Sequence, residues 1–169
     1  MKRTVCLFLI LCFALCLFGC TKQTEELQNP VRFYYPRSTP TYGAADSVIA
    51  WEAQEAAGHT EDYLYLLRQY MKGPKSDTLS RAFPRSVLIK GLQISGDTAY
   101  VLLNNYVSLL SGLELTIACA CLTATVCELT GVSRVTIQAE HALLDGNSAI
   151  TMDRSHILLL DESAANSAD

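Results

Sequence analysis

Three histidines and two nearby glutamates are the side chains that could serve as catalytic acids or bases. His59 precedes an expected helix, His141 follows an expected strand, and His156 begins an apolar run. Glu52 and Glu55 could pair as acid and base, but one such carboxylate pair is common by chance. An enzyme also needs a nucleophile and an orienting group in reach, and no His-Glu-x-x-His or Gly-x-Ser-x-Gly pattern accompanies these residues. We therefore interpret the histidines as structural or surface residues and expect no catalytic site.

Three cysteines in one apolar segment could in principle bind metal or undergo redox chemistry. Cys119, Cys121 and Cys127 are odd in number, so they cannot pair completely. Their spacing does not bring thiols together on one face of a helix within disulfide range. In the alternative, a Cys-x-Cys metal or redox site, the two sulfurs would point about 200° apart on a helix. We predict that these thiols are small buried side chains, and we expect no metal site and no cofactor.

Cys20 has the most specific predicted chemistry, because it ends an apolar N-terminal segment. Lys2 and Arg3 precede a run from Val5 to Phe18, which as a helix would reach only ~21 Å against a ~30 Å bilayer core. Leu17-Phe18-Gly19-Cys20 resembles a bacterial lipobox. A charged start, a short apolar stretch and a small residue at the cut are signal-peptide features. Cleavage there would leave Cys20 to carry lipid, enough for stable membrane attachment. The alternatives are an uncleaved anchor helix and an ordinary secretory signal.

The predicted cleavage divides the chain into four parts. Residues 1–19 are the leader, and residues 20–30 form a polar tether behind the lipidated cysteine. Residues 31–161 are expected to form a single domain, since about 130 residues suffice for one proper core. Residues 162–169 are a small polar tail.

The charge balance excludes one large class of partners. The chain has 13 basic and 17 acidic residues, and the leader contains two of the basic ones, which leaves a mature formal charge of −6. No basic stripe is present, so we expect no nucleic-acid partner. An acidic surface gains nothing from anionic headgroups, so lipid rather than charge must hold the protein at the membrane.

The remaining sequence alternates strands with two helices. Predicted strands are Val31–Tyr35, Ser47–Ala57, Val87–Ile94, Thr98–Leu103 and Arg134–Ala139, with helices from Thr60 to Gly73 and from Ser111 to Leu129. Thr60 and Ser111 are expected to cap the helices, and Gly73 and Gly131 to end them. The apolar run His156–Leu160 is either an edge strand or a helical turn. This β-β-α-β-β-α-β order predicts an α+β fold of two layers, with both helices packed on one face of a mixed β-sheet.

Aromatic residues near the first two strands form a candidate ligand or partner surface. Tyr34, Tyr42 and Trp51, together with Tyr35, could line a groove for glycan or peptide, because aromatic rings give rigid contact area. The favoured alternative is that some of these rings fill the core while the others cover an edge. Exposed strand edges offer a different function, strand addition or stacking between subunits.

Several motifs in this order resemble the GerMN domain of sporulation and spore-germination proteins. Phe33-Tyr34-Tyr35 and the segment Leu66–Pro74, with its Gly-Pro ending, resemble that domain's first strand and helix. The segments Ile89–Ile94 and Thr98–Leu103 are similar to its hairpin, and Gly131–Ile137 to its closing strand.

The resemblance implies a non-catalytic lipoprotein of the cell envelope that acts in sporulation or germination. The implied fold is similar to ring-building motifs, and such domains assemble with envelope protein partners, self-assemble, or anchor complexes. Together with the lipobox, it places the domain on the outer, extracytoplasmic face of the cell membrane. The alternative is a lipoprotein that binds cell-wall glycan or peptide, with peptidoglycan as its partner. An enzyme with an unrecognised site is the third reading.

Overall fold

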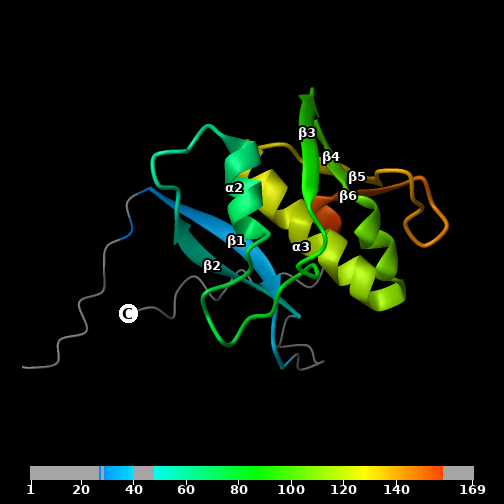
Figure 1. The fold of residues 1–169 in the computed structure, drawn as a ribbon. Coiled ribbons are helices and arrows are strands. Elements are labelled where there is room, and N and C mark those ends of the chain that lie inside the picture. Colours follow the sequence, from blue (N-terminus) through cyan, green and yellow to red (C-terminus); the bar gives the residue numbers. More distant parts are fainter. Residues whose placement is uncertain (1–26, 28, 40–47, 158–169) are drawn as a thin grey trace, which may run out of the picture.

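The computed structural model describes residue 27, residues 29–39 and residues 48–157, which form two small sheets and two α-helices (Figure 1). The elements are β1 (Pro30–Pro36), β2 (Ile49–Glu55), α2 (Tyr63–Tyr70), β3 (Ile89–Ser95), β4 (Thr98–Leu103), the 3₁₀ helix η1 (Asn105–Leu109), α3 (Gly112–Thr130), β5 (Arg134–Ala139), β6 (Ala149–Asp153) and the 3₁₀ helix η2 (Arg154–His156). β1 and β2 pair antiparallel, whereas the second sheet has the order β3-β4-β5-β6. In that sheet β4 and β5 are parallel and the outer pairs are antiparallel. The predicted α+β class is confirmed.

α3 is the central element, and it is apolar on nearly all sides because both sheets pack against it. Leu115 and Leu122 lie on the stripe that joins the larger core. On the opposite side, Cys121 and Ala124 pack with Tyr34 of β1 in a second cluster. By length and hydropathy alone α3 could cross a membrane, but most of it is buried inside the fold. Burial on both sides, as predicted for so apolar a helix, marks it as a core helix of this domain.

β1 is held from two directions, by α3 along its edge and by α2 on one face. The Tyr34 N–H donates to Thr125 Oγ1 of α3 at 3.0 Å, so a helix side chain satisfies a backbone group at the strand edge. On one face, the Phe33 and Tyr35 rings lie 5.8 and 4.9 Å from the Tyr70 ring of α2, the first edge-on and the second stacked. The β-branched and aromatic sequence of β1 thus supplies both the strand propensity and the packing.

The four-stranded sheet has one buried face and one open face. Along β4, Ala99, Val101 and Leu103 are buried against the helices, while Tyr100 and Leu102 alternate to the exposed side. This period of two is the pattern of a sheet with one solvated face.

Most predicted elements and their glycine signals are confirmed. All five predicted strands are present, and the termini of β4 and β5 agree with the prediction. Gly96 opens the tight turn between β3 and β4 with φ of +57°, and Gly131 ends α3 in the left-handed conformation with φ of +76°. Both positions require the freedom that glycine has at positive φ.

Four details of the prediction are wrong. Asp62, not Thr60, caps α2, because its carboxylate accepts the Tyr65 N–H at 2.9 Å. Ser111 does precede α3, but its side chain makes no capping hydrogen bond. A sixth strand, β6, was missed, and the strands divide into two sheets instead of one. β6 is only five residues long and half-buried at the sheet edge, so its apolar alternation is weak. The predicted element at His156–Leu160 lies mostly outside the described residues.

Candidate functional site

The candidate acid–base residues lie on separate elements, where the three histidines are exposed and Glu52 has a structural role. His59 is exposed and stacks on the Tyr65 ring, with 3.9 Å between the ring centroids. His141 lies in the turn after β5 and His156 in η2, both exposed. The Glu52 carboxylate accepts the backbone N–H groups of residues 75 and 76 at 2.8 and 2.9 Å, so it holds the loop after α2.

The three cysteines of the domain are free and buried, as predicted. Burial raises the pKa of the Cys119 thiol to about 12 and that of the Cys127 thiol to about 11. Burial also raises the Cys121 pKa well above its ordinary value. Because the thiolate is the nucleophile and metal ligand, such thiols are inert at neutral pH. In the described part of the chain, no three His, Cys, Asp or Glu side chains gather in a metal-binding arrangement.

Tyr34, predicted as part of a ligand surface, is instead a core residue with 2% exposure. Its hydroxyl accepts a hydrogen bond from the Arg154 guanidinium at 2.9 Å and lies 3.4 Å from a Glu128 oxygen, to which it donates. The Arg154 guanidinium also lies 4.9 Å from the Tyr34 ring centroid. Because α3 and η2 cover the ring and its polar end, Tyr34 does not belong to an exposed ligand surface and instead fills the core, which is the alternative that the sequence favoured.

Of the predicted aromatic surface, Tyr34 is buried and Tyr42 lies outside the described residues, whereas Trp51 is partly accessible. The half-buried Trp51 ring lies 4.6 Å from the Arg32 guanidinium, a cation–π contact. Arg32 in turn lies 3.9 Å from Glu128, which is 3.8 Å from Arg154. The charges therefore alternate from β1 across the end of α3 to η2. The sequence contained no signal for this charge network, since Arg32 and Glu128 are 96 positions apart along the chain and Glu128 and Arg154 are 26 apart.

A groove of about 520 Å³ opens beside Trp51, and we call it the Trp51 groove. It is lined by Pro30, Val31, Arg32, Trp51, Ala53, Thr60, Glu128 and Leu129. An aromatic ring, a guanidinium, a carboxylate and a hydroxyl thus share one opening, where β1 begins and α3 ends. Such a mixture can stack on a ring-shaped ligand and hydrogen-bond its hydroxyl or amide groups.

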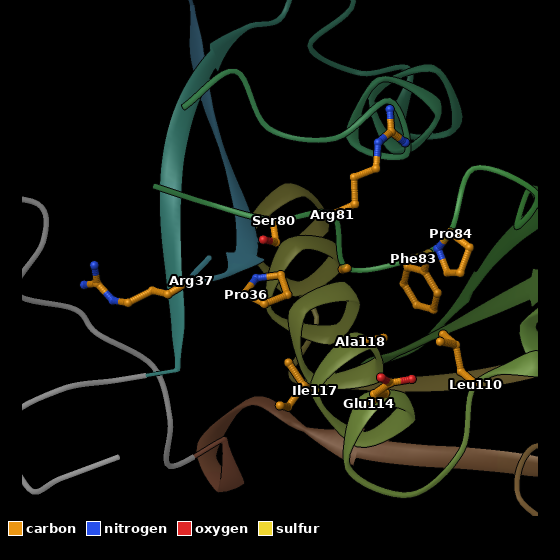
Figure 2. A pocket seen from close by; sticks show the side chains of 11 residues that line it. Pro36, Arg37, Ser80, Arg81, Phe83, Pro84, Leu110, Glu114, Ile117 and Ala118 are labelled. Carbon is orange, nitrogen blue, oxygen red and sulfur yellow. The ribbon is translucent and has the colours of Figure 1, made fainter. Parts of the chain in front are cut away.

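A second groove of about 570 Å³ lies between α3 and the segment before β3, and we call it the Phe83 groove. Figure 2 shows Phe83 and Pro84 on one side of it and Ile117 and Ala118 of α3 on the other. Arg81 points away from the opening and donates to the backbone carbonyls of residues 71 and 72 at the end of α2. The groove is therefore mainly apolar, which suits apolar side chains of a partner better than a polar substrate.

Large apolar side chains are exposed at the end of the domain where α3 begins, and we call this set the apolar tip. Its members are Tyr106, Leu109, Leu113 and Leu143, which are 52% to 72% exposed. The η1 segment contacts β5, and the Asp145 carboxylate accepts the Gly112 N–H at 3.3 Å, so these loops meet (Figure 1). Exposed apolar clusters of this kind mark interaction sites more often than single exposed leucines do.

Comparison with known proteins identifies the family of this chain. The Germane family model, described as sporulation and spore germination, matches residues 32–145. No curated protein matches the chain.

Two solved structures align with the chain at low sequence identity, and one of them, at a TM-score above 0.5, shares its fold. The tandem GerMN domains of the sporulation protein GerM from Bacillus subtilis align with a TM-score of 0.53 and 15% identity, covering 80% of this chain and 48% of that one. The chain therefore spans about half the length of that tandem-domain structure. A candidate lipoprotein from Clostridium perfringens aligns with a TM-score of 0.45 and 14% identity, covering 75% of this chain and 89% of that one.

Proposed function

Because the chain belongs to the Germane family of sporulation and spore-germination proteins, we propose that it acts without catalysis in the envelope of the sporulating or germinating cell. In this proposal the domain assembles with envelope proteins or anchors them, and a lipid on Cys20 holds it at the outer face of the membrane. The family match over residues 32–145 carries the proposal. The buried thiols and dispersed histidines support a non-catalytic role, because neither supplies an activated nucleophile.

The lipid anchor is supported by the lipobox sequence ending at Cys20, which lies outside the described residues. Replacing Cys20 with alanine should either release the protein or leave it with an uncleaved leader, and should abolish incorporation of labelled fatty acid. Cys16→Ala is the matched control, since it changes a leader cysteine outside the cleavage point. A Cys20→Ala protein that is still cleaved and still membrane-bound would refute lipid anchoring.

The assembly role is supported by the apolar tip and by the apolar Phe83 groove, which offer contact surface without catalytic chemistry. A photo-crosslinking residue at Leu109 should capture a specific envelope protein in sporulating cells. The same residue at Asp77, an exposed loop position, serves as the control. Capture of sporulation or germination proteins from Leu109 alone would support the role. Equal capture from both positions, or a deletion strain with normal sporulation and germination, would count against it.

Binding of cell-wall material is the second candidate function, because Trp51 is half-buried beside a groove that also contains Arg32 and Glu128. Trp51 is the single tryptophan of the chain, so its fluorescence reports on this groove directly. Titration with purified muropeptides should shift or quench the emission with a saturable curve. An unchanged spectrum at millimolar muropeptide would eliminate this function and leave the assembly role untouched.

A further inference from the structure

The outer edge of β3 has free backbone groups at two successive outward positions. β3 is the terminal strand of its sheet, and a two-residue turn at Gly96-Asp97 joins it to β4. Gly96 has φ of +57° and occupies the first central position, where this type of hairpin turn needs glycine. In such a hairpin the residues flanking the turn exchange both hydrogen bonds, and bonded pairs then alternate along the ladder. Leu92 and Ile94 therefore direct their N–H and C=O groups away from β4.

This edge is accessible, and its second half is unprotected. Gln93 and Ser95 are exposed, Ile94 is 42% exposed, and the β3–β4 hairpin projects beyond the neighbouring elements (Figure 1). The first half has the features that block strand addition, namely α2 packed beside it, a bulge between Ile89 and Gly91, and the charge of Lys90. Within residues 29–39 and 48–157, no strand pairs with β3 on this side.

The side chains at the two outward positions continue the apolar layer of the core. Leu92 pairs with Val101 and Ile94 with Ala99, and both partners on β4 are buried on the helix side of the sheet. Leu92 packs on the main core cluster, whereas Ile94 extends past it toward solvent. A strand added here would therefore gain main-chain hydrogen bonds and apolar contact together.

We propose that a second copy of this chain occupies this edge, with the two β3 strands antiparallel about a two-fold axis through Gln93. Leu92 then faces Ile94 of the partner subunit, and both outward residues of each chain form main-chain hydrogen bonds. Lys90 faces Gly96 of the partner subunit, so like charges stay apart. An axis at Leu92 would place Ile94 opposite Lys90 of the partner subunit, and an axis at Ile94 would place Leu92 opposite Gly96 of the partner subunit. The Gln93 register alone gives both Leu92 and Ile94 an apolar side chain of the partner subunit as their neighbour.

A two-fold pairing also closes on itself, which other edge pairings do not. Pairing of β3 with the β6 edge of another copy would repeat without end and give filaments. The two-fold dimer instead buries the same edge on both subunits and forms one continuous eight-stranded sheet. The inference names a partner for the assembly role proposed above and rests on that role for its use in the cell.

Cysteine crosslinking of the full chain in producing cells tests the register directly. Residues at the axis form a non-hydrogen-bonded pair with Cα atoms about 4.5 Å apart, within disulfide range. Gln93→Cys should therefore give a covalent dimer under mild oxidation. Ser95→Cys should not, since its two copies would lie about 14 Å apart, four residues at ~3.4 Å each. Gln138→Cys is the matched control, an exposed glutamine on the same sheet face but on the interior strand β5.

A second substitution separates edge pairing from random collision. Ile94→Pro removes an N–H that points away from β4, a change that edge strands tolerate. Added to Gln93→Cys, it should abolish the covalent dimer. Wild-type protein sets the background from uncleaved precursor, which still contains the leader cysteines, while the three domain thiols are buried.

Each outcome decides for or against the proposal. A dimer from Gln93→Cys alone, lost with Ile94→Pro, supports it. The absence of a dimer, an equal yield at Ser95→Cys or Gln138→Cys, or a disulfide to a different protein overturns it. Failure here combined with specific capture from Leu109 would leave the assembly role in place with another partner. Failure of both experiments would remove the assembly role as well.

Discussion

Two buried threonines on α3 provide a sharp test of how β1 is held. Thr125 and Thr123 are both fully buried in the same helix. Thr125 Oγ1 accepts the Tyr34 N–H at 3.0 Å, whereas Thr123 Oγ1 has no hydrogen-bond partner among the residues that the structure describes. Valine has nearly the same shape as threonine but lacks the hydroxyl, so Thr→Val removes the polar atom with little change in packing. The two substitutions should therefore change stability in opposite directions.

The expected magnitudes follow from what each substitution leaves behind. Thr125→Val leaves the Tyr34 N–H buried without an acceptor, which costs about 1–3 kcal/mol of unfolding free energy. Thr123→Val removes an unsatisfied buried hydroxyl and should be neutral or stabilising by up to about 1 kcal/mol. For a domain of this size, 1 kcal/mol corresponds to roughly 3–5 °C in Tm. The two variants should thus differ by about 1–4 kcal/mol, or roughly 3–20 °C in Tm on that scale.

Chemical and thermal unfolding of the two variants and the wild type, followed by circular dichroism, measures this difference. Thr116→Val is the control, because Thr116 is on the same helix but exposed. It should lie within about 0.5 kcal/mol of the wild type, as surface substitutions usually do. Equal destabilisation by Thr123→Val and Thr125→Val would refute the reasoning, since loss of threonine in α3 would then matter irrespective of its hydrogen bonds.

Three further predictions test the core, a turn and the acid stability. The free energy of unfolding should fall as the pH rises above about 8.5, because Cys119 ionises there only in the unfolded chain, while burial raises its folded pKa to about 12. Denaturant midpoints measured over a pH series test this, and Cys119→Ala should make the fall shallower. Gly73→Ala should destabilise the fold more than Gly58→Ala in thermal melts. Both glycines have positive φ, but a Cβ at Gly73 would lie 2.7 Å from the Arg81 side chain, whereas one at Gly58 would have no described atom within 4 Å. Hydrogen bonds from Ser133 lower the pKa of the exposed Asp97 carboxyl, so the stability that its ionised form contributes is present above about pH 4 and is lost as the pH falls through the folded pKa. Asp97→Asn should therefore make Tm fall less steeply with decreasing pH on the acid side, and an unchanged slope would contradict this role.

Much of the local structure could be predicted because local signals dominate it. The period-two alternation of β4 and β5 and the glycines at positions 96 and 131 depend only on neighbours in sequence. β6 was missed because a five-residue edge strand is defined mainly by its hydrogen bonds to β5. The cap of α2 was misplaced by two residues, since Thr60 and Asp62 both carry side-chain oxygens that can accept from a free helix N–H.

The candidate site was less predictable, because burial and charge pairing are properties of the assembled fold. Trp51 and Tyr34 look alike in sequence, as aromatic residues of adjacent strands, and the register places them opposite each other. Only the position of Arg154 and α3 over Tyr34 removes that ring from solvent. The Arg32–Glu128–Arg154 ladder had no sequence signal at all, because charges far apart in the chain pair only after folding.

The sequence by itself determined the chemistry that is written in short motifs: the predicted lipid site at Cys20, the α+β succession, and the apolar character of α3. These features depend on the amino-acid composition and on the spacing of apolar residues, which are fixed by the sequence before any long-range contact forms. The tertiary structure alone decided that α3 is shared by two sheets, that β1 and β2 pair apart from the others, and that β3 ends its sheet with an open edge. Those outcomes depend on which strands pair, and strand pairing is determined by packing between segments that are distant in the sequence.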